Sequence, residues 1–162
     1  NVLDAGGNTP LLFAAENGHH LCVYALLATG ADIDATNKER GLTALAAAAM
    51  RGHSLAVGVL LASGADTSVC DQLWYTALQL AVSSHGKHDG GIVIDTRVVV
   101  GMLLYASTHL PNDEHNRARA MTIAVEANYP EMVDVLQATG ATDGRMVLPR
   151  YDRQDLSSSS VS

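Results

Sequence analysis

A pattern that repeats every 34 residues constrains the fold of this chain more than any other feature of its sequence. The tripeptide Gly30-Ala31-Asp32 recurs as Gly64-Ala65-Asp66, and the pair Leu26-Leu27 recurs as Leu60-Leu61. Self-similarity at this period indicates a stacked array of small units, each of which contacts only its neighbours. In such arrays the concave side, built from successive loops and helices, is the usual working surface. We therefore expect the chain to present a binding surface.

Each unit is predicted to be two short helices joined by a tight turn. In the first copy Thr9 can cap a helix that begins at Pro10, where the missing N–H costs nothing. Gly18 ends this helix in a left-handed conformation, and a second helix that begins at His19 ends in the same way at Gly30. Helices this short are marginal alone in water, so we expect neighbouring pairs to cover one another's apolar sides.

Spaced positions across the whole unit recur in the first two copies. They are Thr9-Pro10-Leu11, Ala14-Ala15, Gly18-His19, Val23 and Leu26-Leu27 in the first copy, and Thr43, Leu45, Ala48-Ala49, Gly52-His53, Val57 and Leu60-Leu61 in the second. With the Gly-Ala-Asp tripeptides, this pattern resembles the ankyrin repeat. The resemblance implies an all-α ankyrin-repeat solenoid, in which stacked helix-turn-helix units are joined by hairpin-like loops and bind another protein.

The third and fourth copies depart from the pattern. The third begins at Asp71 and Thr76, but about ten extra residues, His85 to Ile94, separate its two helices. The fourth is degenerate and has Asn128 where the helix-ending Gly belongs, and Asn is the next best residue in that left-handed conformation. We expect a repeat domain over residues 1–142, with units at about 4–37, 38–70, 71–110 and 114–142, and a flexible, serine-rich C-terminal tail over residues 143–162.

The first residues indicate a fragment. Asn1-Val2-Leu3-Asp4 match the junction that ends a preceding ankyrin unit, and no initiator Met is present, so we expect further repeats before Asn1. Two functional classes follow from the resemblance. One is a protein–protein interaction module, an adaptor or scaffold, and the alternative is a regulatory or substrate-holding segment of a larger enzyme or channel.

Composition limits the partners. The formal net charge is −7, from 17 acidic and 10 basic side chains, which argues against nucleic acid because phosphates need a basic patch. No apolar run approaches the roughly 18 residues of a membrane helix, so we expect no direct membrane insertion. Cys22 and Cys70 are no disulfide framework; we predict Cys22 in the core and Cys70 in a loop between repeats. We expect a monomeric domain, or part of a larger chain, in the cytoplasm or nucleus.

Catalytic and cofactor motifs are missing from the sequence. It has no Gly-x-Ser-x-Gly elbow, no P-loop and no His-Glu-x-x-His, so we expect no enzyme activity, no catalytic residue and no cofactor. His85, His88 and Asp89 could present metal ligands, but a third strong ligand at a defined spacing is missing, so a solvated loop is the better interpretation. Catalysis through His85 and His88 is the least favoured alternative. Ile92-Val93-Ile94 is too apolar for water and is expected to dock on the array or on a partner.

Trp74 is the departure from the repeat pattern that bears most on binding. It stands where the pattern has a turn Gly, at a loop tip between Leu73 and Tyr75. Aromatic and Arg side chains are the usual anchors of protein interfaces. The alternative is that the ring packs against the insertion within the chain.

In ankyrin proteins, partners commonly contact the loop tips and the exposed end of the first helix of each unit. Leu42 and Met50 could join the Trp74 tip in one apolar patch flanked by arginines, although scattered surface apolarity is an equal alternative for these two. The predicted partner-binding residues are Arg40, Leu42, Met50, Arg51, Leu73, Trp74, Tyr75 and Ser84.

Overall fold

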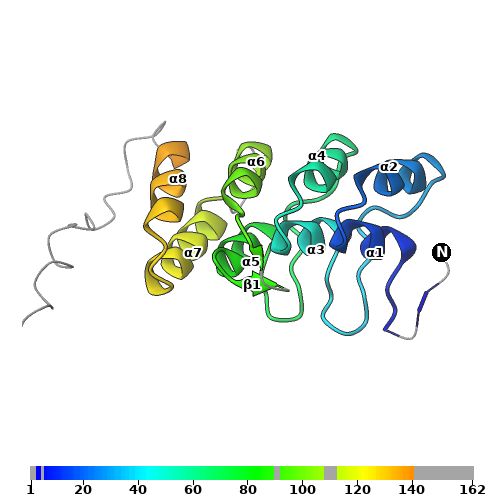
Figure 1. The fold of residues 1–162 in the computed structure, drawn as a ribbon, viewed down its shortest axis with the longest axis horizontal. Helices are drawn as coiled ribbons and strands as arrows, with labels where there is room; N and C mark the ends of the chain where they lie inside the picture. The colour runs from blue at the N-terminus through cyan, green and yellow to red at the C-terminus, as the bar shows by residue number, and fades with distance from the viewer. Residues whose placement is uncertain (1–2, 5, 90–91, 108–112, 141–162) are drawn as a thin grey trace, which may run out of the picture.

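Helix pairs stand side by side in two layers (Figure 1). The computed structural model describes residues 3–4, 6–89, 92–107 and 113–140. The lower layer in Figure 1 contains α1 (Pro10–Glu16), α3 (Ala44–Met50), α5 (Ala77–Ser84) and α7 (Asp113–Glu126), and the upper layer contains α2 (His20–Ala28), α4 (Ser54–Ala62), α6 (Arg97–Ser107) and α8 (Pro130–Gly140). This is the all-α solenoid that the sequence predicts, and its only departure among the described residues is a pair of two-residue strands, β1 (His88–Asp89) and β2 (Ile92–Val93).

The predicted caps and turns set the helix ends. Thr9 Oγ1 accepts a hydrogen bond from the Leu12 N–H at 3.1 Å, and Thr43 Oγ1 accepts one from the Ala46 N–H at 3.1 Å. In the third repeat, the Gln79 side chain instead accepts from the N–H of Thr76 at 3.0 Å. These bonds satisfy N–H groups that a helix start leaves unpaired, so the first helices of the first three repeats begin at the same place in their repeat.

Alanine lets the lower layer stack closely. In α3 the five residues Ala44 and Ala46–Ala49 are all buried, together with Leu45. This helix lies between α1 and α5, which cover its two sides (Figure 1). Small side chains there allow the backbones to approach, and the upper layer contributes buried leucine and valine to the core, such as Leu60 and Val100.

The N-terminal end of the array exposes residues whose counterparts are buried one repeat later. Phe13 is 62% exposed, whereas Ala47 at the same repeat position is 1% exposed. Cys22 is also exposed, whereas Ala56 is fully buried, so the prediction that Cys22 is a core residue is wrong. The reason is that Ala47 and Ala56 are covered by the preceding helix pair, and no helix precedes α1 in the described part of the chain.

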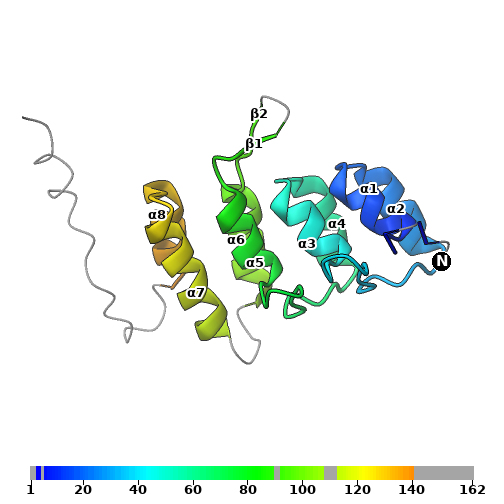
Figure 2. The same ribbon diagram turned by 90° about the horizontal axis from the view of Figure 1, so that it is seen from below.

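The insertion leaves the stack at the end of α5. Figure 2 shows β1 and β2 projecting from the side of the array opposite to the loops between repeats. The two strands pair antiparallel, His88 with Val93 and Asp89 with Ile92. The C-terminal tail predicted over residues 143–162 lies outside the described residues. Within the described ranges, none of the helices combines the length and the apolar character needed to cross a membrane.

Candidate protein-binding surface

The third loop, residues 70–76, is a tight turn organised by Asp71. Its Oδ1 accepts hydrogen bonds from the N–H groups of Leu73 and Tyr75, both at 2.9 Å. The Trp74 N–H donates to the Asp71 carbonyl at 3.0 Å, which closes the turn. In this turn Trp74 has φ = 63°, where the first two repeats have Gly7 at φ = 73° and Gly41 at φ = 70°. Trp74 therefore occupies the glycine position in a conformation that costs a non-glycine residue roughly 1–2 kcal/mol.

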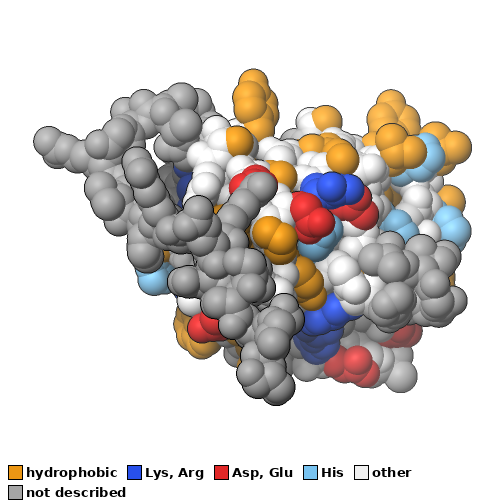
Figure 3. Space-filling view, turned by 60° about the vertical axis from the view of Figure 1, so that its left-hand side comes forward, with side chains coloured by type: hydrophobic (Ala, Val, Ile, Leu, Met, Phe, Trp, Pro, Cys, Tyr) orange, Lys and Arg blue, Asp and Glu red, His pale blue; other side chains and the backbone are white. Residues whose placement is uncertain are grey.

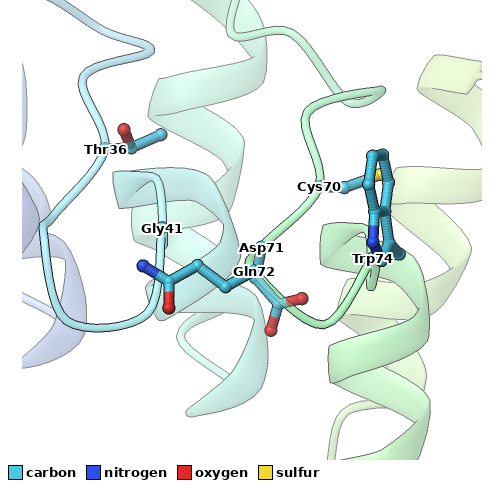
Figure 4. A pocket seen from close by; sticks show the side chains of 6 residues that line it. All are labelled: Thr36, Gly41, Cys70, Asp71, Gln72 and Trp74. Atoms are coloured by element: carbon cyan, nitrogen blue, oxygen red, sulfur yellow. The ribbon is translucent and has the colours of Figure 1, made fainter.

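The Trp74 side chain is directed into solvent. It is 75% exposed, and the neighbouring Leu73 is 67% exposed. Trp74 precedes the N-terminal end of α5, whereas the insertion follows its C-terminal end, so the ring does not pack against the insertion (Figure 2). In Figure 4 the indole stands beside the Cys70 side chain at the rim of an open cleft of about 350 Å³. The cleft is lined by Thr36, Gly41, Cys70, Asp71, Gln72 and Trp74.

The second and third loops are joined by hydrogen bonds. The Gln72 N–H donates to the Arg40 carbonyl at 2.9 Å, and Gln72 Nε2 donates to the Lys38 carbonyl at 3.0 Å. Two backbone acceptors in the second loop thus hold one residue of the third. This fixes the spacing of the two loop tips, so they form one continuous surface.

Arg119 of α7 supports the third loop from the fourth repeat. Its guanidinium carbon lies 5.3 Å from the centroid of the Tyr75 ring, and its Nη1 donates to the Trp74 carbonyl at 2.9 Å. Tyr75 is half-buried in this contact. Arg119 was not among the residues predicted for the surface. It could have been noticed in the sequence, because an Arg stands there where the other repeats have their capping Thr. We call Arg40, Leu73, Trp74, Tyr75 and Arg119 the loop-tip surface.

Comparison with known proteins gives the family. A family model for ankyrin repeats in three copies matches residues 11–94. The chain belongs to the ankyrin repeat family. A crystal structure of an ankyrin repeat domain from Acinetobacter baumannii AYE is similar, with a TM-score of 0.69 and 31% sequence identity over 85% of this chain and 67% of that one. A search of curated proteins found no match. Ankyrin repeats are generally protein–protein interaction modules, and the fold is typically non-catalytic.

Two residues predicted for the ankyrin array's binding surface lie in its interior. Leu42 is 5% exposed and packs in the core, and its N–H donates to Asn37 Oδ1 at 2.9 Å. Ser84 is also 5% exposed, because the insertion leaves α5 at this residue and the chain returns over the last turn of the helix. Their predicted place on the surface is therefore wrong.

The other predicted residues divide into two groups. Arg40 is exposed and its Nη1 lies 3.8 Å from the sulfur of the half-buried Met50, so Met50 extends the loop-tip surface along α3. Arg51 is instead paired with Glu16 of the first repeat, with Nη2 and Oε1 3.0 Å apart. Its guanidinium joins neighbouring repeats at the opposite end of α3 from the loops.

The base of the insertion is packed into the array. His85 is only 8% exposed; its Nδ1 accepts the Thr96 N–H at 3.3 Å, and its ring meets the Tyr129 ring edge-on at 5.3 Å. The prediction of a solvated loop is wrong for this residue. Ile94 is half-buried against Gly52, so this residue of the apolar segment docks on the array as expected. No group of three metal-binding side chains occurs among the described residues, and the side chains of His88 and Asp89 lie outside that description.

Proposed function

We propose that this ankyrin array is an adaptor or scaffold module that binds a partner protein through the loop-tip surface and Met50 of α3. The observation that carries the proposal is the exposed Trp74 in a left-handed backbone conformation. Glycine would adopt this turn without strain, and the free chain gains little from an indole that faces water. A binding role accounts for a large aromatic residue at this position.

The chemistry of the surface suits a protein segment. Trp74 and Leu73 offer apolar area, and Arg40 offers a guanidinium that can pair with a carboxylate or a backbone carbonyl. Arg119 and Tyr75 hold the loop in place before binding, so less conformational entropy is lost when a partner arrives. We infer a partner segment that combines apolar and acidic residues.

The test separates binding from folding by a single substitution. Trp74→Gly removes the indole and keeps the turn, so the variant should be at least as stable as the wild type but should lose the partner. Phe13→Ala is the matched control, because Phe13 is similarly exposed but lies at the other end of the array. Affinity capture from an extract of the source organism, read by mass spectrometry, compares the three proteins. Retention of the same partner by Trp74→Gly and the wild type would contradict the proposal.

The two cysteines bear on where the protein is located. Cys22 and Cys70 are both free thiols. Free thiols persist in reducing compartments, which supports a location in the cytoplasm or nucleus. We propose a binding role without enzyme activity or cofactor, which the acidic net charge directs towards protein and away from nucleic acid.

A further inference from the structure

The cleft between the second and third loops holds a carboxylate oxygen that lacks a donor. Asp71 lines this cleft and is only 7% exposed. Its Oδ1 accepts the N–H groups of Leu73 and Tyr75, whereas its Oδ2 is buried and has no hydrogen-bond partner among the described residues. Burying a carboxylate oxygen without a donor costs free energy, so this atom points to a donor that is supplied from outside the chain.

The second loop shows which way the Oδ2 atom is directed. Asn37 organises that loop in the same manner, because its Oδ1 accepts the N–H groups of Arg40 and Leu42. The other end of the Asn37 side chain, Nδ2, donates to Asn8 Oδ1 of the first loop at 3.0 Å. By this correspondence Asp71 Oδ2 faces the second loop, where Leu42 holds the place of Asn8 and has no polar atom in its side chain. The carboxylate oxygen therefore lies on the cleft side of the third loop and lacks the partner that Asn37 has.

The charge around the cleft favours a cation. Residues 32–37 and 64–72, which flank the cleft, contain four Asp and no Lys or Arg. Hydrogen bonds from the Ser68 side chain and backbone hold the pKa of one of these carboxyls, Asp66, below its usual value, so it stays charged at neutral pH. Arg119 approaches the third loop from the fourth repeat, on the other side from the cleft.

The cleft differs from the other exposed apolar surface of the array. Hydrophobic side chains stand out along the upper edge of the molecule, where the upper-layer helices lie (Figure 3). Leu21, Leu55 and Val98 of that layer are exposed, but they offer apolar area alone, which does not select a ligand. The cleft instead combines an apolar rim, the Trp74 indole, with the unpaired oxygen of Asp71.

We propose that the cleft takes a lysine side chain of the partner protein. This inference rests on the proposed function, and it adds one basic residue to the apolar and acidic residues of the partner segment. An ammonium group is a compact charge on a flexible stem, so it can reach a single recessed oxygen. A guanidinium pairs best with two free carboxylate oxygens, and Asp71 Oδ1 is already occupied by the turn. The methylene groups of the lysine then lie against the Trp74 indole at the rim.

Titration with Nα-acetyl-lysine methylamide tests the cleft without the partner. Trp74 is the only tryptophan of the chain, so its fluorescence reports on this site alone. We expect a saturable change with a dissociation constant of about 1–10 mM. The norleucine derivative, which has the same stem without the charge, and sodium chloride at the same ionic strength should give no saturation. A wild type without a saturable response to the lysine derivative overturns the proposal, as does tighter binding of the arginine derivative.

Asp71→Asn tests the carboxylate. The amide keeps an Oδ1 acceptor for the N–H groups of the turn, as Asn37 does in the second loop, so the variant should fold. Its binding of the lysine derivative should be weaker by about tenfold or more. Asp4→Asn is the matched control and should bind as the wild type does, because it removes the same charge from the first loop, where both carboxylate oxygens accept bonds from Asn8. Circular dichroism confirms that each variant is folded, and equal binding by Asp71→Asn and the wild type overturns the proposal.

Affinity capture with the same variants separates this inference from the proposed function. Loss of the partner by Trp74→Gly together with its retention by Asp71→Asn would contradict the lysine cleft and leave the adaptor role intact. Retention by Trp74→Gly would contradict the adaptor role, and the titration with the lysine derivative would still decide whether the cleft binds an ammonium group.

Discussion

The second and third repeats share one period but differ at both of their turns. At the turn between helices, the second repeat uses only Arg51, Gly52 and His53, whereas the third uses residues 85–96. At the loop tip the second repeat has Gly41 and the third has Trp74, with nearly the same φ. The comparison shows where this array accepts extra chain and extra bulk without losing its stacking.

The turn contacts show that the insertion links three repeats. In the second repeat, His53 Nε2 lies 2.9 Å from the Glu16 carbonyl and thus reaches the preceding repeat. In the third repeat, Ile94 lies against Gly52 of the preceding repeat, and His85 contacts Tyr129 of the following one. Thr96 Oγ1 also donates to the Ala81 carbonyl at 2.7 Å, which fastens the returning chain to α5. The base of the insertion therefore has a structural role.

Removal of the insertion should produce the largest effect. Deletion of residues 85–94 loses the buried His85 and the Ile94 contact, and we expect the free energy of unfolding to fall by about 3 kcal/mol. Replacement of residues 88–93 by two glycines keeps both contacts and should change it by less than about 0.5 kcal/mol. Urea unfolding followed by circular dichroism measures both variants. Equal stability of the two would show that the base contributes nothing.

Gly52→Ala should have the next largest effect. Gly52 has φ = 74°, and a Cβ there would lie 3.2 Å from both the Asp95 carbonyl oxygen and Ile94 Cγ2. Gly30 has φ = 85° with nothing within 4 Å of such a Cβ, so Gly30→Ala measures the backbone strain alone. We expect losses of about 2 kcal/mol for Gly52→Ala and about 1 kcal/mol for Gly30→Ala in urea unfolding. Equal losses would show that the returning chain of the insertion shifts to make room for the added Cβ at residue 52.

At the loop tip, Trp74→Gly should stabilise the fold by about 0.5–1 kcal/mol, because relief of the left-handed strain exceeds the backbone entropy that Gly loses. The second repeat leaves less room for a side chain at the glycine position, because a Cβ on Gly41 would lie 3.3 Å from the Gln72 backbone nitrogen. Gly41→Ala should therefore destabilise. Thermal unfolding of the two variants gives the signs, and destabilisation by Trp74→Gly would mean that the indole contributes to the fold.

The smallest effect concerns pH. Hydrogen bonds from the Arg97 side chain, and then from its backbone N–H, lower the pKa of Asp95 from 3.8 to about 2. This carboxylate stabilises the fold above pH 4, and its contribution is lost as the pH falls towards 2. Because the side chain is half exposed, we expect about 0.5 kcal/mol or less. Arg97→Ala should be less stable than the wild type at pH 6, with the difference shrinking towards pH 2; a constant difference would contradict this.

The repeat pattern could predict what depends on local sequence. Thr9 and Thr43 cap their helices, and Trp74 occupies the glycine position of its turn, because caps and tight turns are fixed by a few adjacent residues. The array and its insertion were predicted for the same reason.

Burial depended on neighbours that the pattern does not identify. Leu42 and Tyr75 hold the same position before their Thr, yet Leu42 is buried and Tyr75 is half-buried. Arg119, which packs on Tyr75, lies 44 residues further along the chain. Cys22 occupies a position that is apolar in the neighbouring repeats, but none of the described helices covers it, so it is exposed. Such contacts between distant segments could not be predicted from periodicity alone.

The alanines of α3 also bear on the order of folding. An alanine side chain has no rotamer freedom to lose, and Ala has the highest helix propensity. Ordering α3 therefore costs less conformational entropy than ordering the other helices of the array. It has a neighbouring first helix on each side. Folding is therefore expected to start at the second repeat and spread outwards, and the amides of α3 should be the last to exchange with solvent.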